Sequence, residues 1–214
     1  MRRAATILAL TGAALLSACG SSPPTKFYVL TPAPAARRAG AAGAPIQVAA
    51  VHLPEELDRL EMVSPLGPNR LDVRGEDRWA APLDDMSRRV LTQDLEQRLP
   101  AGAVVSPRTP QPQGARKLVV DLQDFGLDAS GGGRLQGTWS LIGPNRKPAL
   151  RRPVDLHAAA AGAAPQSQAA AMSRLLGDLA DAIAEEAGAP PATTSAGPAA
   201  LRPEASPAPS TRPG

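Results

Sequence analysis

Apolar positions that recur at steps of three and four predict two long amphipathic helices. The first is expected from about Leu83 to Leu99, with Pro82 in its first turn, where a helix tolerates proline, and Pro100 at its end. The second is expected from about Ser167 to Glu186. Their apolar stripes consist of Leu83, Met86, Val90, Leu91, Leu95 and Leu99 in the first helix, and of Met172, Leu175, Leu176, Leu179 and Ile183 in the second.

Shorter apolar runs predict about seven strands, four of them before the first helix. Phe27–Leu30 is the first, and Ile46–Leu53 is the second. Because Ile46–Leu53 is apolar on both faces, it is typical of a central strand that is covered by helices. The runs 61–64 and 70–74 flank the turn residues Leu66-Gly67-Pro68-Asn69, which predicts a hairpin.

Three more strands are expected between the helices. The runs 117–127 and 134–142 alternate around a glycine triplet at 131–133 and predict a second hairpin. A bulge near Asp124 would bring the apolar residues at both ends of the first run to one face. The run 150–157 contains Pro153, which places it at a sheet edge.

The order strands, helix, strands, helix indicates an α+β fold. We expect a single domain with a mixed, mostly antiparallel sheet and the two long helices packed on one face. The domain is expected over residues 27–187, and an internal linker of Ala, Gly, Pro and Arg occupies 31–45. Residues 188–214 are rich in Pro and Ala and offer too little apolar surface to fold, so they are expected to be a disordered tail.

The N-terminal residues have the pattern of a secretory signal. Two arginines are followed by an apolar run from Ala4 to Leu16, which is shorter than the roughly 20 residues of a membrane-spanning helix. The run ends in Leu16-Ser17-Ala18-Cys19, which resembles the lipobox of bacterial lipoproteins. This resemblance implies cleavage of a signal peptide, residues 1–18, and attachment of diacylglycerol and an acyl group to Cys19. The alternatives are an ordinary signal peptide or a cysteine that stands here by chance.

Lipidation at Cys19 would change what the rest of the chain can do. Cys19 is the only cysteine, so no thiol would remain, and residues 19–26 would form a lipidated tether. Loss of residues 1–18 lowers the formal net charge from +3 to +1, and no basic stripe with aromatic residues favours binding to nucleic acid. Gly20 replaces the Asp that marks retention at the inner membrane in many such lipoproteins. The resemblance therefore implies the outer membrane, facing the periplasm.

The sequence offers little for catalysis. His52 and His157 lack the spacing of metal ligands, and there is no G-x-S-x-G nucleophile elbow. The glycine triplet leads into a strand, whereas a phosphate-binding loop leads into a helix. Asp84 and Asp85 fall in the first turn of a predicted helix, where they compensate its dipole, and each has an arginine four residues later with which it could pair. We therefore expect no enzymatic activity, no cofactor and no metal site.

Arg78 and Trp79 stand directly before the first predicted helix and are candidates for contact with a partner. Both residue types are common at the energetic centres of protein interfaces. Trp79 could instead pack beneath the first helical turn. We favour the core for Trp79 and partner contact for Arg78, because Trp has an apolar stripe to join while Arg keeps its charged head in water.

Several of these motifs together resemble the ABC-type transport auxiliary lipoprotein family. They are the lipobox, Phe27-Tyr28-Val29-Leu30, Leu53-Pro54, Leu57-Asp58-Arg59, and Arg78-Trp79 followed by Pro82-Leu83 and a helix. The resemblance covers roughly residues 7–187. It implies a periplasmic α/β domain without catalytic activity, in the outer-membrane component of a paraquat-inducible-type intermembrane transport system. The implied partner carries mammalian-cell-entry (MCE) domains and moves lipid between the two membranes.

Three classes of function follow from these observations. The first is a docking module, anchored in the outer membrane, that receives an MCE-type transporter and that contacts phospholipid as a further candidate ligand. The second is a structural envelope lipoprotein that binds peptidoglycan or an outer-membrane assembly complex. A periplasmic hydrolase is the third, and the missing catalytic residues argue against it.

Overall fold

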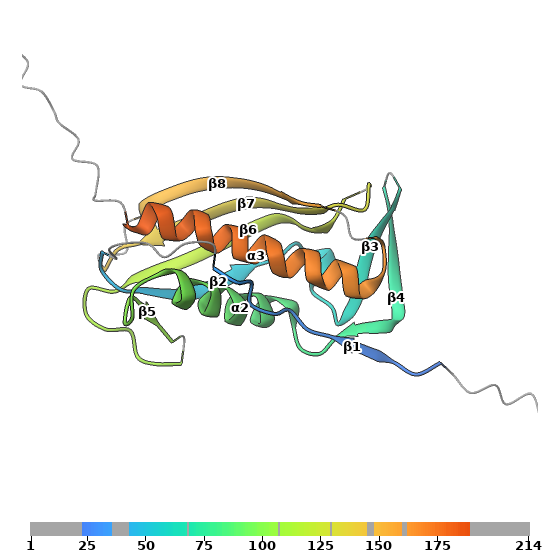
Figure 1. Cartoon of the computed structure of the whole chain (residues 1–214), viewed down its shortest axis with the longest axis horizontal. Helices are drawn as coiled ribbons and strands as arrows, with labels where there is room; N and C mark the ends of the chain where they lie inside the picture. The colour runs from blue at the N-terminus through green and yellow to red at the C-terminus, as the bar shows by residue number, and fades with distance from the viewer. Residues whose placement is uncertain are drawn as a thin grey trace, which may run out of the picture.

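The structure is a computed structural model that describes residues 23–35, 43–67, 69–106, 108–128, 130–144, 148–159 and 162–188. Within these ranges the chain forms two β-sheets and two long helices, which confirms the α+β class (Figure 1). Segments 1–22, with Cys19 and the expected signal peptide, and 189–214, with most of the expected tail, lie outside the described residues. The elements are β1 (Lys26–Tyr28), β2 (Ile46–His52), a 3-10 turn (Glu55–Leu57), β3 (Glu61–Gly67), β4 (Arg70–Trp79), α2 (Leu83–Arg98), β5 (Val104–Val105), β6 (Arg116–Leu127), β7 (Gly133–Ile142), β8 (Pro148–Ala158) and α3 (Pro165–Gly188).

The larger sheet has five strands in the order β5-β2-β6-β7-β8. Strand β2, which is second from one edge, is parallel to both of its neighbours, while β6, β7 and β8 form an antiparallel meander. As Pro153 predicts, β8 lies at an edge of this sheet. The hairpin of β6 and β7 around the glycine triplet is also confirmed.

The smaller sheet has three strands in the order β1-β4-β3 and is a feature that the sequence pattern did not predict. The hairpin of β3 and β4 is the predicted one, although β4 is longer than expected. The short strand β1 pairs with the end of β4 in parallel. One mixed sheet was expected, but β5 and β6 already occupy both sides of β2. The first strand and the hairpin therefore pair with each other.

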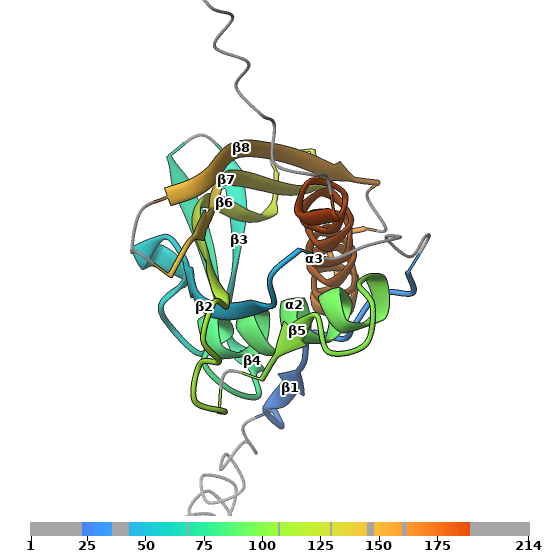
Figure 2. The same cartoon turned by 90° about the vertical axis from the view of Figure 1, so that its left-hand side faces the viewer.

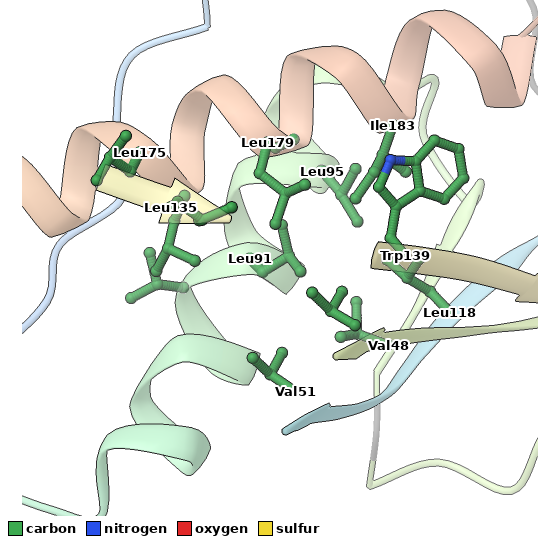
Figure 3. Packing of buried hydrophobic residues seen from close by; sticks show 14 of the residues in the cluster. Val48, Val51, Leu91, Leu95, Leu118, Leu135, Trp139, Leu175, Leu179 and Ile183 are labelled. Carbon is green, nitrogen blue, oxygen red and sulfur yellow. The ribbon is translucent and has the colours of Figure 1, made fainter. Parts of the chain in front are cut away.

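Helices α2 and α3 pack side by side on the same face of the five-stranded sheet, and the sheet curves around them (Figure 2). All residues of the two predicted apolar stripes are buried. Figure 3 shows part of this core, in which Leu91 and Leu95 of α2, Leu179 and Ile183 of α3, and Val48 and Trp139 of the sheet belong to one buried cluster. The helices therefore supply the apolar surface that the inner face of the sheet requires.

Strand β2 differs from its predicted form. The sequence suggested two covered faces, but the register shifts between Val48 and Ala50, so that Ala49 is an exposed bulge residue. The bulge brings Val51 to the buried face that holds Ile46 and Val48. The pattern suggested two apolar faces because the bulge at Ala49 changes the alternation, whereas Ile46, Val48 and Val51 lie on one buried face.

Strand β6 has the predicted bulge. Its register against β7 shifts between Leu122 and Asp124, and Phe125 and Leu127 are buried together with Leu118.

The ion pair at the start of α2 differs from the expected one in its spacing. Arg88 contacts Asp85, three residues earlier, at 2.6 Å between Nη2 and Oδ1, where spacings of four residues were expected.

Candidate docking surface on the three-stranded sheet

Trp79, the last residue of β4, lies in the core and is only 2% exposed. Its backbone N–H donates to the carbonyl of Leu60 at 2.7 Å, and the following N–H of Ala80 donates to the carbonyl of Tyr28 at 2.9 Å. These bonds hold the end of β4 between β1 and the start of β3. Trp79 therefore belongs to the core, as we favoured, and its side chain is not on the surface.

Arg78 lies at the surface, with 40% of its side chain exposed. In the register of the sheet it stands between Phe27 of β1 and Glu61 of β3. Its Nη2 donates to the carboxylate of Glu61. A hydrogen bond from the glutamate's own backbone N–H and then this bond from Arg78 hold the pKa of Glu61 below its ordinary value. Arg78 is thus oriented by an ion pair and keeps further donor capacity toward solvent.

The two faces of the three-stranded sheet have different surroundings. One face packs on the start of α3, where the hydroxyl of Ser64 donates to Oε1 of Gln168 at 3.0 Å and Met62 is fully buried. We call the other the outer face. Glu61, Val63 and Pro65 occupy alternate positions along β3, so their side chains share the outer face. Their register partners on β4 are Arg78, Val73 and Leu71, and Arg78 is also paired with Phe27 of β1. On the outer face Phe27, Leu71 and Val73 are between 45% and 65% exposed.

Two hollows lie beside this sheet. One of about 440 Å³ is bounded by the end of β2, the 3-10 turn and the start of α2. Its lining includes His52 and Asp84 but no serine or cysteine. The other, of about 280 Å³, separates the hairpin from the end of β6 and is lined by Val63, Leu71 and Phe125 among others.

The histidines are not assembled into a site. Both His52 and His157 are exposed, and His157 lies 3.3 Å from a carboxylate oxygen of Asp155. In the part of the chain that the structure describes, no three His, Cys, Asp or Glu side chains cluster as metal ligands would. None of the helices in the described ranges is long and apolar enough to cross a bilayer.

A buried polar cluster between the two helices was not predicted. Arg98 donates from Nε to Asp181 at 2.7 Å and lies 3.5 Å from Asp94, which is itself completely buried. Asp94 accepts the backbone N–H of Ala33 at 2.8 Å, and Arg98 donates to the carbonyl of Ala33 at 3.3 Å. The start of the expected linker is thus held against α2. An Asp–Arg pair at a spacing of four residues beside the apolar stripe is the only sequence signal for it.

Comparison with known families identifies the chain. A family model described as the ABC-type transport auxiliary lipoprotein component matches residues 28–184, from β1 to the last turns of α3. The chain belongs to this family. The family is that of an auxiliary component of ABC-type transport, and its members are lipoproteins. This agrees with the resemblance that the sequence motifs carry.

Solved structures share the fold of this auxiliary lipoprotein. A crystal structure of an uncharacterized protein aligns with a TM-score of 0.63 at 20% identity and covers 77% of this chain and 99% of that one. A Xanthomonas campestris protein of the DUF330 family aligns with a TM-score of 0.56 at 19% identity, covering 74% of this chain and 92% of its own. No curated protein sequence matches significantly.

Proposed function

We propose that this auxiliary lipoprotein is a docking module, anchored in the outer membrane and facing the periplasm, for an MCE-type ABC transporter that moves lipid between the membranes. The family match over residues 28–184 carries the proposal, since the matched region includes both sheets and both helices. In this mechanism the protein positions its partner and performs no reaction.

The anchor in this proposal is Cys19. Cleavage after Ala18 would expose the cysteine at the N-terminus, where acyl chains can be attached to its sulfur and amine. A single acyl chain holds a protein weakly, whereas two or more make the anchoring stable, at about 0.8 kcal/mol per buried CH₂. Residues 19–26 then form a tether that ends where β1 begins at Lys26.

The contact with the transporter is assigned to the outer face around Arg78. The Arg78–Glu61 pair is exposed enough to be reached and is held in a defined geometry by the sheet. Burying such a charge pair in an interface can give it specificity, because a partner without a matching carboxylate or carbonyl leaves the remaining N–H donors of Arg78 without an acceptor. A phospholipid headgroup is a second candidate ligand for the same guanidinium.

The anchor is tested by the Cys19→Ala variant of the full chain. We expect that it no longer incorporates radiolabelled palmitate and remains as uncleaved or mislocalised precursor. The unchanged chain, expressed alongside, should carry the label and fractionate with the outer membrane. Palmitate incorporated into Cys19→Ala, or the unchanged chain found in the inner membrane, would contradict the assignment.

The contact is tested by comparing Arg78→Ala with Trp79→Ala. Arg78→Ala should keep its stability and lose about 2 kcal/mol or more of binding energy in a pull-down with the MCE component of the transporter. Trp79→Ala should lose about 3–5 kcal/mol of folding free energy, because it empties a packed core position. Full binding by Arg78→Ala would show that this arginine does not contact the transporter. Selective retention of the protein on peptidoglycan would favour a structural envelope lipoprotein instead.

A further inference from the structure

The apolar side chains that remain exposed are gathered on or beside the three-stranded sheet. Among the residues that the structure describes, the exposed large apolar side chains are Phe27, Val29, Leu60, Leu66, Leu71 and Val73. All of them belong to β1, β3 and β4 or directly adjoin these strands. We refer to this set as the apolar patch. Phe27, Leu71 and Val73 of this set share the outer face, and exposed apolar side chains that lie together are typical of a site of contact with a protein or a membrane.

The patch lies at the end of the molecule where the chain arrives from its N-terminus. In Figure 1, β1 and the hairpin of β3 and β4 lie at one end of the long axis, and the last turn of α3 lies at the other. Only seven residues, 20–26, separate Cys19 from Phe27. Fully extended they reach roughly 25 Å, so an anchored chain holds this end of the fold close to the bilayer.

The side chains next to the patch also suit a lipid surface. Lys26, Arg59 and Arg70 are exposed, and each directly precedes a residue of the patch in the sequence. Long basic side chains can lay their stems along apolar surface and reach phosphate groups with their heads. Asp58 and Glu76 are exposed as well, so the apolar side chains rather than a large net charge would supply most of the attraction.

We propose that the apolar patch of the three-stranded sheet rests on the phospholipid bilayer in which the protein is anchored, and so fixes the orientation of the domain on the membrane. The inference rests on the anchor in the proposed function. Each contact alone is weak, but the tether keeps the patch at high effective concentration beside the bilayer. Because Phe27 is the register partner of Arg78, a transporter that delivers lipid to the membrane surface would contact Arg78 at the edge of the membrane-facing patch.

The experiment places single spin labels on the acylated protein in vesicles of phosphatidylethanolamine and phosphatidylglycerol. Once Cys19 is acylated, an introduced cysteine is the only thiol. Leu71→Cys and Val73→Cys report on the patch, and they are more informative than Phe27, which the tether alone keeps near the bilayer. Asp72→Cys, between them on the opposite face of β4, and Ala101→Cys, an exposed residue after α2, are the matched controls.

We expect the labels at 71 and 73 to become accessible to oxygen and protected from a water-soluble nickel chelate, while those at 72 and 101 stay in water. If mass spectrometry shows acylation but the labels at 71 and 73 stay in water, the membrane contact is excluded and the anchor stands. Labels at 71 and 73 that become immobilised only after the MCE component is added would assign the patch to that protein instead. An unacylated product would contradict the anchor and, with it, this inference.

Discussion

At the scale of single residues, Asp94 is the most unusual group in the described structure. Its carboxyl is completely buried between the helices, and burial raises its pKa to about 6, although the N–H of Ala33 and the charge of Arg98 act in the opposite direction. The nearby Asp181 adds to the increase. Arg98 therefore faces two carboxylates, and burial favours the protonated form of Asp94.

This shift predicts a pH dependence of stability. The pKa of Asp94 is higher in the folded chain than in the unfolded one, where it is about 3.8. Between these values the folded state holds a proton that the unfolded state has lost, so the contribution of Asp94 to stability falls as the pH rises from about 4 to about 7. By the size of the shift, the loss is at most about 3 kcal/mol.

Urea unfolding of the Asp94→Asn variant over this pH range is the measurement. Asparagine can still accept the N–H of Ala33 but does not titrate, so the free energy of unfolding should depend less steeply on pH than in the unchanged chain. Asp85→Asn, an exposed acid on the same helix, controls for the general removal of a negative charge. Parallel pH curves for Asp94→Asn and the unchanged chain would contradict the prediction.

At the scale of elements, the segment 31–35 is held by a close approach to α3. A Cβ added to Gly177 would lie 2.5 Å from the Cβ of Ala33, which is too short for two carbon atoms. The N–H of Thr31 donates to the hydroxyl of Ser173 at 3.1 Å, one turn away on the same helix. Glycine at 177 therefore serves as the point where the chain after β1 crosses the helix.

A double-mutant cycle tests this crossing. Gly177→Ala should gain up to about 1 kcal/mol of helix propensity but lose about 1–3 kcal/mol through overpacking, and we expect a net loss. Adding Ala33→Gly removes the opposing Cβ, so the double variant should be more stable than the sum of the single effects by about 1 kcal/mol or more. The free energies come from urea unfolding of all four chains. Strict additivity would mean that the segment does not rest on α3.

The elements that depend on local pattern could be predicted from the sequence. Both helices, the hairpins and the bulge in β6 follow from periodicity and turn residues, and so does the edge position of β8. The two-residue strand β5 is too short to carry a period, and the bulge at Ala49 is hidden because alanine fits either an exposed or a buried face. The division into two sheets depends on which long-range pairings compete for β2, and no local pattern reports that competition.

Only part of the candidate site could be predicted from the sequence. Arg78 and Trp79 stand out because of their types and their place before a helix, and the structure separates them into a surface residue and a core residue. The apolar patch was not predicted, because apolar and polar residues alternate along a strand in the same way whether its apolar side chains are buried or exposed. Only the pairing of β1 with β4 brings Phe27 and the hairpin into one sheet.

At the scale of the whole molecule, the two ends of the described chain lie far apart. The described chain begins beside β1 and ends with α3, at opposite ends of the long axis (Figure 1). The last buried side chains of α3 are Ile183, Ala184 and Ala187. An anchor before β1 would therefore leave the end of α3 at the side of the domain farther from the membrane.

The C-terminal residues are expected to contribute nothing to the stability of the domain. Residues 189–214 consist largely of Ala, Pro, Ser and Thr and contain one leucine, so they offer no apolar face that could offset the entropy of ordering them. Truncation after Gly188 should leave the melting temperature almost unchanged in a calorimetric scan. Truncation after Leu179 is the matched control, because it also removes the buried Ile183 and Ala187 and should destabilise the domain strongly. If truncation after Gly188 lowered the melting temperature by more than a few degrees, the tail would have to pack against the folded domain.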